Sequence, residues 1–172
     1  LDGPSVETDI MEINNTMSRY LREERFALLP QTMIYVERTL HNGKLRRGLV
    51  GMVDLEQYDY EPGSPAQVRA TEGTVLSRIP PRVAVRKNAP IELPHVMLLT
   101  DDPERTVIEP LAREKAGMEQ VYDFDLMERG GHLAGWKLGR EQLSAVAGAL
   151  QALADPAAFN ARYGTQDQPV LL

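Results

Sequence analysis

The spacing of apolar side chains divides the chain into helical and strand-like segments. Over residues 8–27, apolar side chains recur at intervals of three, four and seven, which places them on one face of an amphipathic helix. The most regular helical pattern covers residues 140–154, where an apolar stripe runs among alanines. Weaker helical patterns cover residues 104–116 and 156–162.

Strand-like runs surround two turn-forming pairs. The runs 32–40 and 46–54 flank Asn42-Gly43, a pair that suits a tight turn whose central residues have positive φ. Two β-hairpins are therefore predicted. The second turns at Gly130-Gly131, between strands over 119–127 and 132–138.

Two more apolar runs predict strands over residues 94–100 and from 169 onward, while residues 57–68 have the composition of a loop. These elements predict an α+β (mixed α/β) fold, with two β-hairpins and further strands in a mixed sheet packed with about four helices. The length suits one domain over residues 1–172. Because the chain lacks an initiating Met and stops at a strand-like run, we expect an internal fragment of a longer protein, truncated at its C-terminus.

Composition narrows the classes of protein that fit. The chain has no cysteine, which excludes disulfides, thiolate catalysis and cysteine–zinc sites. It has no apolar run long enough to span a membrane and no signal-peptide layout, so we expect a cytoplasmic protein without membrane partners. A formal net charge of −6 argues against a general nucleic-acid binder.

Residues 69–90 depart from this acidic balance, with a net charge of +4. Within this window, Ser77 is predicted to cap a helix that carries Pro80 and Pro81 in its first turn and ends near Asn88. The arginines of this helix lie four residues apart and therefore project from one side. They are Arg78, Arg82 and Arg86, with Arg69 upstream of them.

This arginine face is a candidate phosphate site. Guanidinium groups hold phosphate or carboxylate by paired hydrogen bonds. Upstream, Thr71 and Thr74 add hydroxyl groups, and the glycine between them lets backbone N–H groups approach an anion. The alternative is that the arginines are solvated surface charges paired with acidic side chains.

Acidic residues near this face are candidates for catalysis. Asp101 and Asp102 follow the predicted strand 94–100, and strand ends of this kind often face a ligand crevice. Glu72 or Asp101 would act as the base, and Asp102 would hold Mg²⁺ beside phosphate groups. The alternative is that an aspartate caps the following helix.

Two motifs give the chain a family resemblance. "TEGTVLSRIPPR" and "ELPHVMLLTDDP" resemble the bacterial domain-of-unknown-function family 1015, and the likeness runs from about residue 18 to the C-terminus. The family often has histidine where this chain has Thr71. Family members continue into a glycine- and histidine-containing motif similar to the one that binds nucleotide phosphates in the ParB/sulfiredoxin-like superfamily, where some proteins phosphorylate free serine. The resemblance thus implies a nucleotide- or pyrophosphate-handling enzyme, with ATP, ADP or pyrophosphate and Mg²⁺ as its ligands.

Two classes of function follow from these observations. The first is part of a small-molecule kinase-like enzyme that transfers a phosphoryl group to a hydroxylated metabolite such as serine. The second is a non-catalytic binding or scaffold domain, whose basic stretch docks an acidic partner or whose hairpin edges bind a second copy of the chain.

Overall fold

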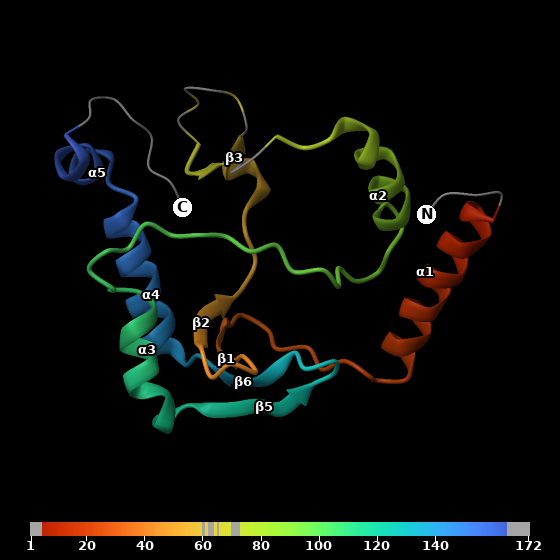
Figure 1. The fold of residues 1–172 in the computed structure, drawn as a ribbon, viewed down its shortest axis with the longest axis horizontal. Coiled ribbons are helices and arrows are strands. Elements are labelled where there is room, and N and C mark those ends of the chain that lie inside the picture. Colours follow the sequence, from red (N-terminus) through yellow and green to blue (C-terminus); the bar gives the residue numbers. More distant parts are fainter. Residues whose placement is uncertain (1–4, 60, 62–63, 65, 70–72, 165–172) are drawn as a thin grey trace. The chain divides into compact units, whose positions relative to one another are not determined.

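The computed structural model describes residues 5–59, 61, 64, 66–69 and 73–164, and these fall into two compact units (Figure 1). The first unit is made of Leu1–Leu29 and Thr71–Leu98, and the second of Pro30–Ala70 and Leu99–Leu172. The α+β class is confirmed, because helices and an antiparallel sheet are both present. The expectation of one domain stays a prediction.

The first unit contains two α-helices that contact each other, α1 (Val6–Arg22) and α2 (Ile79–Arg86). Helix α1 begins near the predicted position but ends five residues earlier. Its end is set by Glu24, whose φ of 53° is left-handed, and by a hydrogen bond of 2.9 Å from the Arg25 amide to the Tyr20 carbonyl. This 6→1 bond is the Schellman ending, which satisfies a free carbonyl of the last turn.

Helix α2 confirms the helix predicted in the basic stretch, but the predicted cap is wrong. Ser77 lies inside a short 3₁₀ helix, η2 (Leu76–Arg78), and no side chain caps α2. The 3₁₀ turn continues directly into α2 through Arg78, whose backbone is already helical. No extended residue is therefore left at the position that a capping serine occupies.

The second unit is built on a four-stranded sheet in the order β2-β1-β6-β5. All its neighbours are antiparallel, so the predicted mixed sheet is corrected to an antiparallel one made of the two predicted hairpins. The strands β1 and β6 join the hairpins at the centre. The bounds are β1 (Ile34–Thr39), β2 (Leu45–Val50), β5 (Glu119–Leu126) and β6 (Gly131–Lys137).

Two short strands lie near the two ends of the predicted loop 57–68 and pair with each other. Strands β3 (Tyr58–Asp59) and β4 (Val68–Arg69) are two residues each and pair in parallel, and a 3₁₀ turn, η1 (Leu55–Gln57), precedes them. A pairing this short leaves no alternation of apolar and polar positions to read, so sequence patterns do not find it.

The second hairpin turns at Glu128 and Arg129, just before the predicted Gly130-Gly131: both have left-handed φ, at 53° and 59°, and the Gly130 amide donates to the Met127 carbonyl at 2.9 Å. The first hairpin turns at the predicted Asn42-Gly43, with a different geometry. The Gly43 amide donates to the Leu40 carbonyl at 2.8 Å, and only Gly43 of the Asn42-Gly43 pair has positive φ, at 79°. This is a three-residue loop with a left-handed glycine at its end, rather than a two-residue turn. In the second hairpin, Gly131 has φ of 90°, and a Cβ there would overlap the Thr39 carbonyl oxygen.

Helices cover one face of the sheet and form the core with it. The fully buried Tyr35 of β1 packs with Val107, Leu111, Leu138 and Val146. Apolar positions at intervals of three and four on the helices face the alternate positions of the strands, as the sequence pattern predicts. The covering helices are α3 (Ile108–Glu114) and α4 (Arg140–Leu153), followed by a 3₁₀ turn η3 (Lys115–Gly117) after α3 and by α5 (Pro156–Tyr163) after α4.

The predicted strand over 94–100 is wrong. Residues 94–100 belong to no strand, and 80% of Val96 is exposed. An apolar run becomes a strand only when another strand pairs with its backbone, and no described residue does so here. The strand predicted from residue 169 lies outside the described residues. In the described part of the chain, no helix has the length and apolar character needed to cross a membrane.

Candidate functional site

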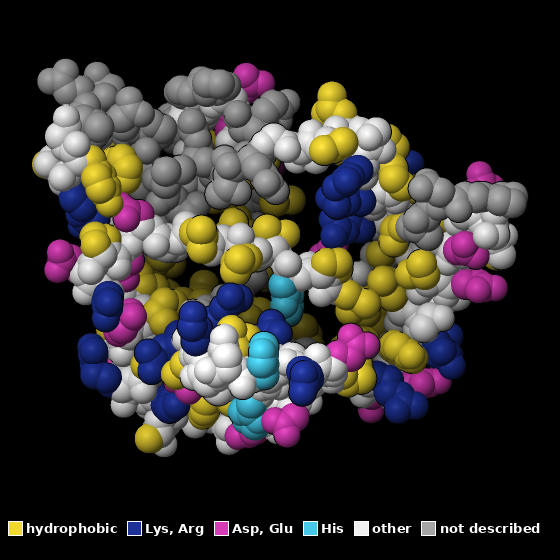
Figure 2. Space-filling view, in the orientation of Figure 1, with side chains coloured by type: hydrophobic (Ala, Val, Ile, Leu, Met, Phe, Trp, Pro, Cys, Tyr) yellow, Lys and Arg dark blue, Asp and Glu magenta, His cyan; other side chains and the backbone are white. Residues whose placement is uncertain are grey.

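The arginine face of α2 has the predicted geometry. Arg78, Arg82 and Arg86 are exposed and one helical turn apart, and Figure 2 shows a dark blue run of cationic side chains alongside α2. Arg86 is held by Glu92, with 3.1 Å between Nε and Oε1. Neither Arg78 nor Arg82 has an acidic partner among the described residues, so both guanidinium groups are available to an anion.

The other predicted phosphate-binding residues come from other segments of the chain. Thr74 is exposed in the segment before η2. Arg69 belongs to β4 in the second unit, whereas the α2 arginines belong to the first. Thr71 and Glu72 lie outside the described residues, so their predicted roles stay predictions.

Apolar side chains of η2 and α2 flank the arginines. Leu76, Ile79 and Val83 follow one another at intervals of three and four and are exposed. An exposed apolar edge beside unpaired arginines is a composition found at binding surfaces. Sequence analysis singled out the arginines but not the exposure of these neighbours, because exposure depends on what packs against the helix.

Asp101 and Asp102 both bond to their own chain. The Tyr163 hydroxyl donates to both oxygens of Asp101 at 2.8 Å, and Arg162 lies 3.8 Å away, so Asp101 ties the end of α5 to this turn. In Asp102, Oδ1 accepts from the Thr106 hydroxyl at 3.0 Å and Oδ2 from the Val107 amide at 2.9 Å. Asp102 thus fixes the turn before α3 without capping that helix, since its bond goes to the amide of the N-cap residue Val107 itself and no capping bond to α3 is made among the described residues.

The bonding of Asp102 also sets its charge state. Burial alone raises the pKa of the Asp102 carboxyl, but hydrogen bonds from the Thr106 and Val107 backbone outweigh it, and the pKa lies below its ordinary value. The carboxylate is thus ionised with both oxygens occupied. Within the described ranges, no group of three or more acidic or histidine side chains is placed to hold a metal ion.

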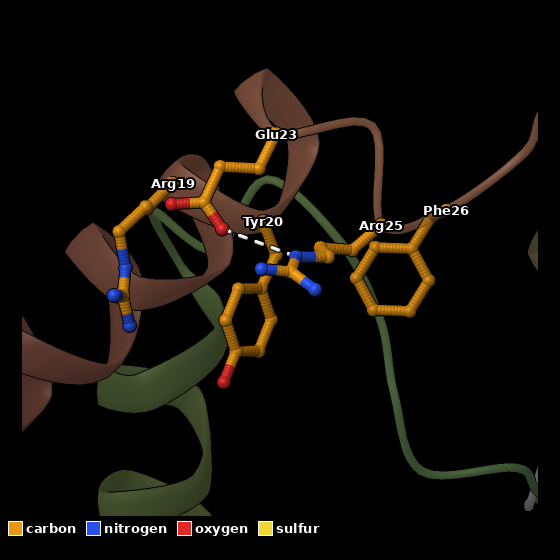
Figure 3. Close-up of a pocket in the computed structure, with 5 residues that line it drawn as sticks. All are labelled: Arg19, Tyr20, Glu23, Arg25 and Phe26. Carbon is orange, nitrogen blue, oxygen red and sulfur yellow. Dashed lines mark hydrogen bonds and ion pairs between the residues drawn. The ribbon is translucent and has the colours of Figure 1, made fainter.

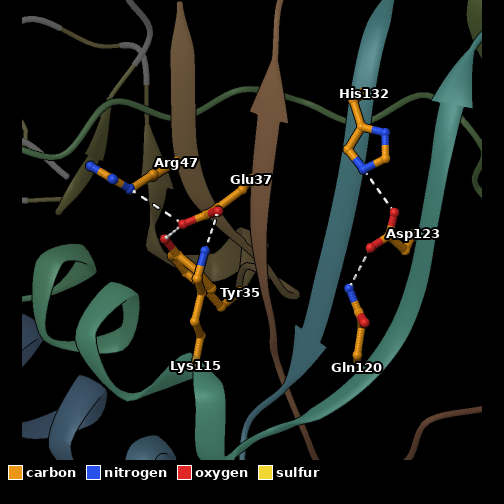
Figure 4. A network of polar contacts seen from close by, with 7 residues as sticks. All are labelled: Tyr35, Glu37, Arg47, Lys115, Gln120, Asp123 and His132. Carbon is orange, nitrogen blue, oxygen red and sulfur yellow. Dashed lines mark hydrogen bonds and ion pairs between the residues drawn. The ribbon is translucent and has the colours of Figure 1, made fainter.

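Sequence analysis missed a polar network on the covered face of the sheet (Figure 4). The carboxylate of Glu37 accepts a hydrogen bond from the Tyr35 hydroxyl at 2.6 Å and from Lys115 Nζ at 2.6 Å. Arg47 Nε lies 3.5 Å from the same carboxylate, and Lys115 Nζ lies 4.9 Å from the centre of the Trp136 ring. Strands β1 and β2 and the η3 turn therefore meet at one carboxylate, and Lys115 links it to Trp136 of β6.

Burial and charge act in opposite directions on this network. Burial, together with the bond to Glu37, raises the pKa of the Tyr35 phenol well above its ordinary value. Burial alone also raises the pKa of Glu37, but the hydrogen bonds from Lys115 and Tyr35 outweigh it, and the pKa lies below its ordinary value. At neutral pH Tyr35 thus remains a hydrogen-bond donor and Glu37 an anion, which makes the network a structural tie between η3 and the sheet.

A second cluster lies on the same face, one strand further along. The register places Glu37 of β1 opposite Ala134 of β6, and Ala134 opposite Asp123 of β5. The two ring nitrogens of His132 lie 2.7 Å from Asp123 and 2.8 Å from Asp125. A neutral imidazole has one N–H, so two carboxylate contacts favour the doubly protonated ring. The hydrogen bond to Asp125, with the charge of Asp123, accordingly raises the pKa of His132.

One signal in the sequence points to the first cluster. A hairpin turning at Asn42-Gly43 brings Glu37 opposite Arg47, an opposite-charge pair across the strands. The contributions of Tyr35 and Lys115 have no such signal. They depend on the docking of α3 and η3 against β1, which no local pattern specifies.

The comparisons with known proteins agree with the resemblance seen in the sequence. A family model described as "Protein of unknown function (DUF1015)" matches residues 2–159. The match begins nearer the N-terminus than the expected start near residue 18, and it ends at residue 159 rather than at the C-terminus. No curated protein and no solved structure matches the chain. Because the matched region covers most of its length, the chain belongs to the DUF1015 family of proteins of unknown function.

Proposed function

We propose that the arginine face of α2 binds the phosphate groups of a small molecule, as the anion-binding part of a nucleotide- or pyrophosphate-handling enzyme. One observation carries the proposal: Arg78 and Arg82 are exposed, one turn apart, and have no acidic partner among the described residues. Guanidinium groups pair with phosphate oxygens bidentately. Two of them about 5.4 Å apart along the helix can each contact one phosphoryl group of a pyrophosphate.

In this proposal the arginines neutralise charge and a base outside the described residues completes the chemistry. Phosphoryl transfer depends mainly on positioning and charge stabilisation, which is what arginines supply. Glu72 lies six residues before Arg78 and is the proposed base, and serine is the type of hydroxylated acceptor that the ParB/sulfiredoxin-like resemblance suggests. Asp101 and Asp102 contribute less to the proposal than the sequence suggested, since both carboxylates have partners in their own chain.

The test is calorimetric titration of the whole 172-residue chain with pyrophosphate, ADP and ATP, each with and without Mg²⁺. We expect Arg82→Ala to weaken binding by about 1–2 kcal/mol, or about 5–30-fold, because an exposed charged hydrogen bond is lost. The matched control is Arg113→Ala, another exposed helical arginine without an acidic partner among the described residues. Equal affinity in wild type and Arg82→Ala, or no binding of any of the three ligands, refutes the proposal.

A second candidate function is docking of an acidic macromolecular partner. It is favoured by the exposed apolar edge of Leu76, Ile79 and Val83, which a free phosphate would leave uncovered. Under this function, pyrophosphate does not bind, while Val83→Ser and Arg82→Ala both weaken a salt-sensitive complex with an acidic peptide. Phosphate-ligand binding that Val83→Ser leaves unchanged would favour the first function instead.

A further inference from the structure

A pocket lies at the C-terminal end of α1, within the first unit (Figure 3). Its volume is about 400 Å³, and all five side chains that line it are exposed, so it opens widely to solvent. Two arginines, two aromatic rings and one carboxylate line it: Arg19, Tyr20, Glu23, Arg25 and Phe26.

The backbone ending of α1 builds this pocket. Glu24 has a left-handed φ of 53°, a conformation that costs a residue with a side chain about 1 kcal/mol relative to glycine. The conformation turns the chain back so that the Arg25 amide reaches the Tyr20 carbonyl at 2.9 Å. Phe26 is thereby brought to Tyr20, with 6.4 Å between the ring centres.

The two arginines are only partly used by their neighbours. Arg19 lies over the Tyr20 ring, 5.3 Å from its centre, and has no acidic partner among the described residues. Arg25 bonds to Glu23 through Nε alone, at 3.1 Å, which leaves the two terminal nitrogens of its guanidinium group unused. Two positive charges against one negative charge give the pocket a net charge of +1.

The rings add a surface for a flat ligand. Tyr20 is 39% exposed and Phe26 is 46% exposed, so neither ring is taken up by the core. Aromatic rings at this separation and tilt offer both a face and an edge to a third ring. Guanidinium groups stack on such rings and bind carboxylate or phosphate at their edges.

We infer that this pocket binds a small planar aromatic molecule that carries a carboxylate or phosphate group. The ring of the ligand packs against Tyr20 and Phe26, and its anionic group pairs with Arg19 and the free nitrogens of Arg25. Glu23 accepts from a ring amino or hydroxyl group. The site is separate from the α2 arginines and does not depend on the phosphate-binding function proposed for them.

The test follows the ring resonances of Tyr20 and Phe26 by NMR in the whole chain. The probes are AMP and indole-3-acetate, which distinguish a nucleotide from an aromatic carboxylate, with ribose 5-phosphate and adenosine as controls that each lack one half of the ligand. We expect at least one of the two aromatic anions to shift both rings. Both controls should bind at least about tenfold more weakly, because each loses one kind of contact.

Variants assign the binding to this pocket. Arg19→Gln and Tyr20→Leu should each weaken the binding about tenfold, because each removes one contact while preserving the helix. Arg22→Gln changes an arginine on the same helix that does not line the pocket, and Arg82→Ala changes the α2 face; neither should matter. The inference is overturned if neither aromatic anion shifts the rings, or if Arg82→Ala abolishes the binding while Arg19→Gln leaves it unchanged.

Discussion

Replacing Lys115 with methionine removes the ammonium group from the Glu37 network and keeps an unbranched side chain that fits against Trp136. The carboxylate then retains the Tyr35 hydroxyl at 2.6 Å and Arg47 at 3.5 Å. Only 12% of the Glu37 side chain is exposed, so water cannot fully replace the lost donor. The variant therefore leaves a charge that is largely buried and only partly compensated.

The size of the effect follows from the exposure of the two partners. An exposed ion pair contributes about 0.2–1 kcal/mol, and breaking a buried pair costs about 3–5 kcal/mol. Lys115 is 37% exposed, which places this pair between the two limits. We expect Lys115→Met to lower the free energy of unfolding by about 2 kcal/mol.

The chain contains a reporter and a matched control. Trp136 is its only tryptophan and lies beneath Lys115, so fluorescence during urea unfolding follows the unit that holds the network. A loss of about 2 kcal/mol lowers the urea midpoint by about 1 M when m is about 2 kcal/mol/M. Lys137→Met removes an ammonium 3.4 Å from Glu119, a 68% exposed carboxylate of the same sheet, and should cost less than about 0.5 kcal/mol.

The pH dependence gives an independent check. The pKa of Glu37 is lowered by folding, so its contribution to stability is present above the ordinary value of 4.5 and disappears as pH falls through the folded value. The difference in stability between wild type and Lys115→Met should therefore shrink between about pH 7 and about pH 3. A loss no larger than that of Lys137→Met, or a difference that does not change with pH, refutes this account of the network.

Two further predictions concern the strands. Gly131→Ala should lower the free energy of unfolding in the urea assay by more than about 2 kcal/mol, because the added Cβ overlaps a carbonyl oxygen of β1. Gly43→Ala, where a Cβ meets open space, should lower it by only about 1 kcal/mol. His132 should titrate by NMR above its ordinary pKa and return toward it in Asp123→Asn/Asp125→Asn. The stability that the His132 pairs contribute is complete below the unfolded pKa of the imidazole and is lost as pH rises through its folded pKa. A double variant in which His132 titrates as in wild type would contradict the paired geometry.

Local patterns were sufficient for elements whose signal lies within a few neighbouring residues. The helices α1, α2, α4 and α5 and both hairpins were predicted within a few residues of their bounds. The end of α1 at Arg22 was not, since the apolar spacing continues past the left-handed Glu24. A left-handed residue that is not glycine leaves no mark in the sequence.

Longer-range features could not be predicted in the same way. The run 94–100 has the composition of a strand, but a strand also needs a partner backbone, and residue composition does not supply one. The partners of Asp101 and Asp102 show the same limit. The partner of Asp101 lies 62 residues away at Tyr163, while Asp102 bonds within its own turn to Thr106 and Val107.

The sequence by itself determined the class of fold, the family, the two hairpins and the spacing of three arginines on one helix, because each depends on residue identity and local periodicity. The tertiary structure decided which charges are paired. It joined the hairpins through β1 and β6, tied Lys115 to Glu37 across 78 residues, and left Arg82 without an acidic partner among the described residues. Charge pairing depends on distances across the fold, and those distances are set by packing rather than by position along the chain.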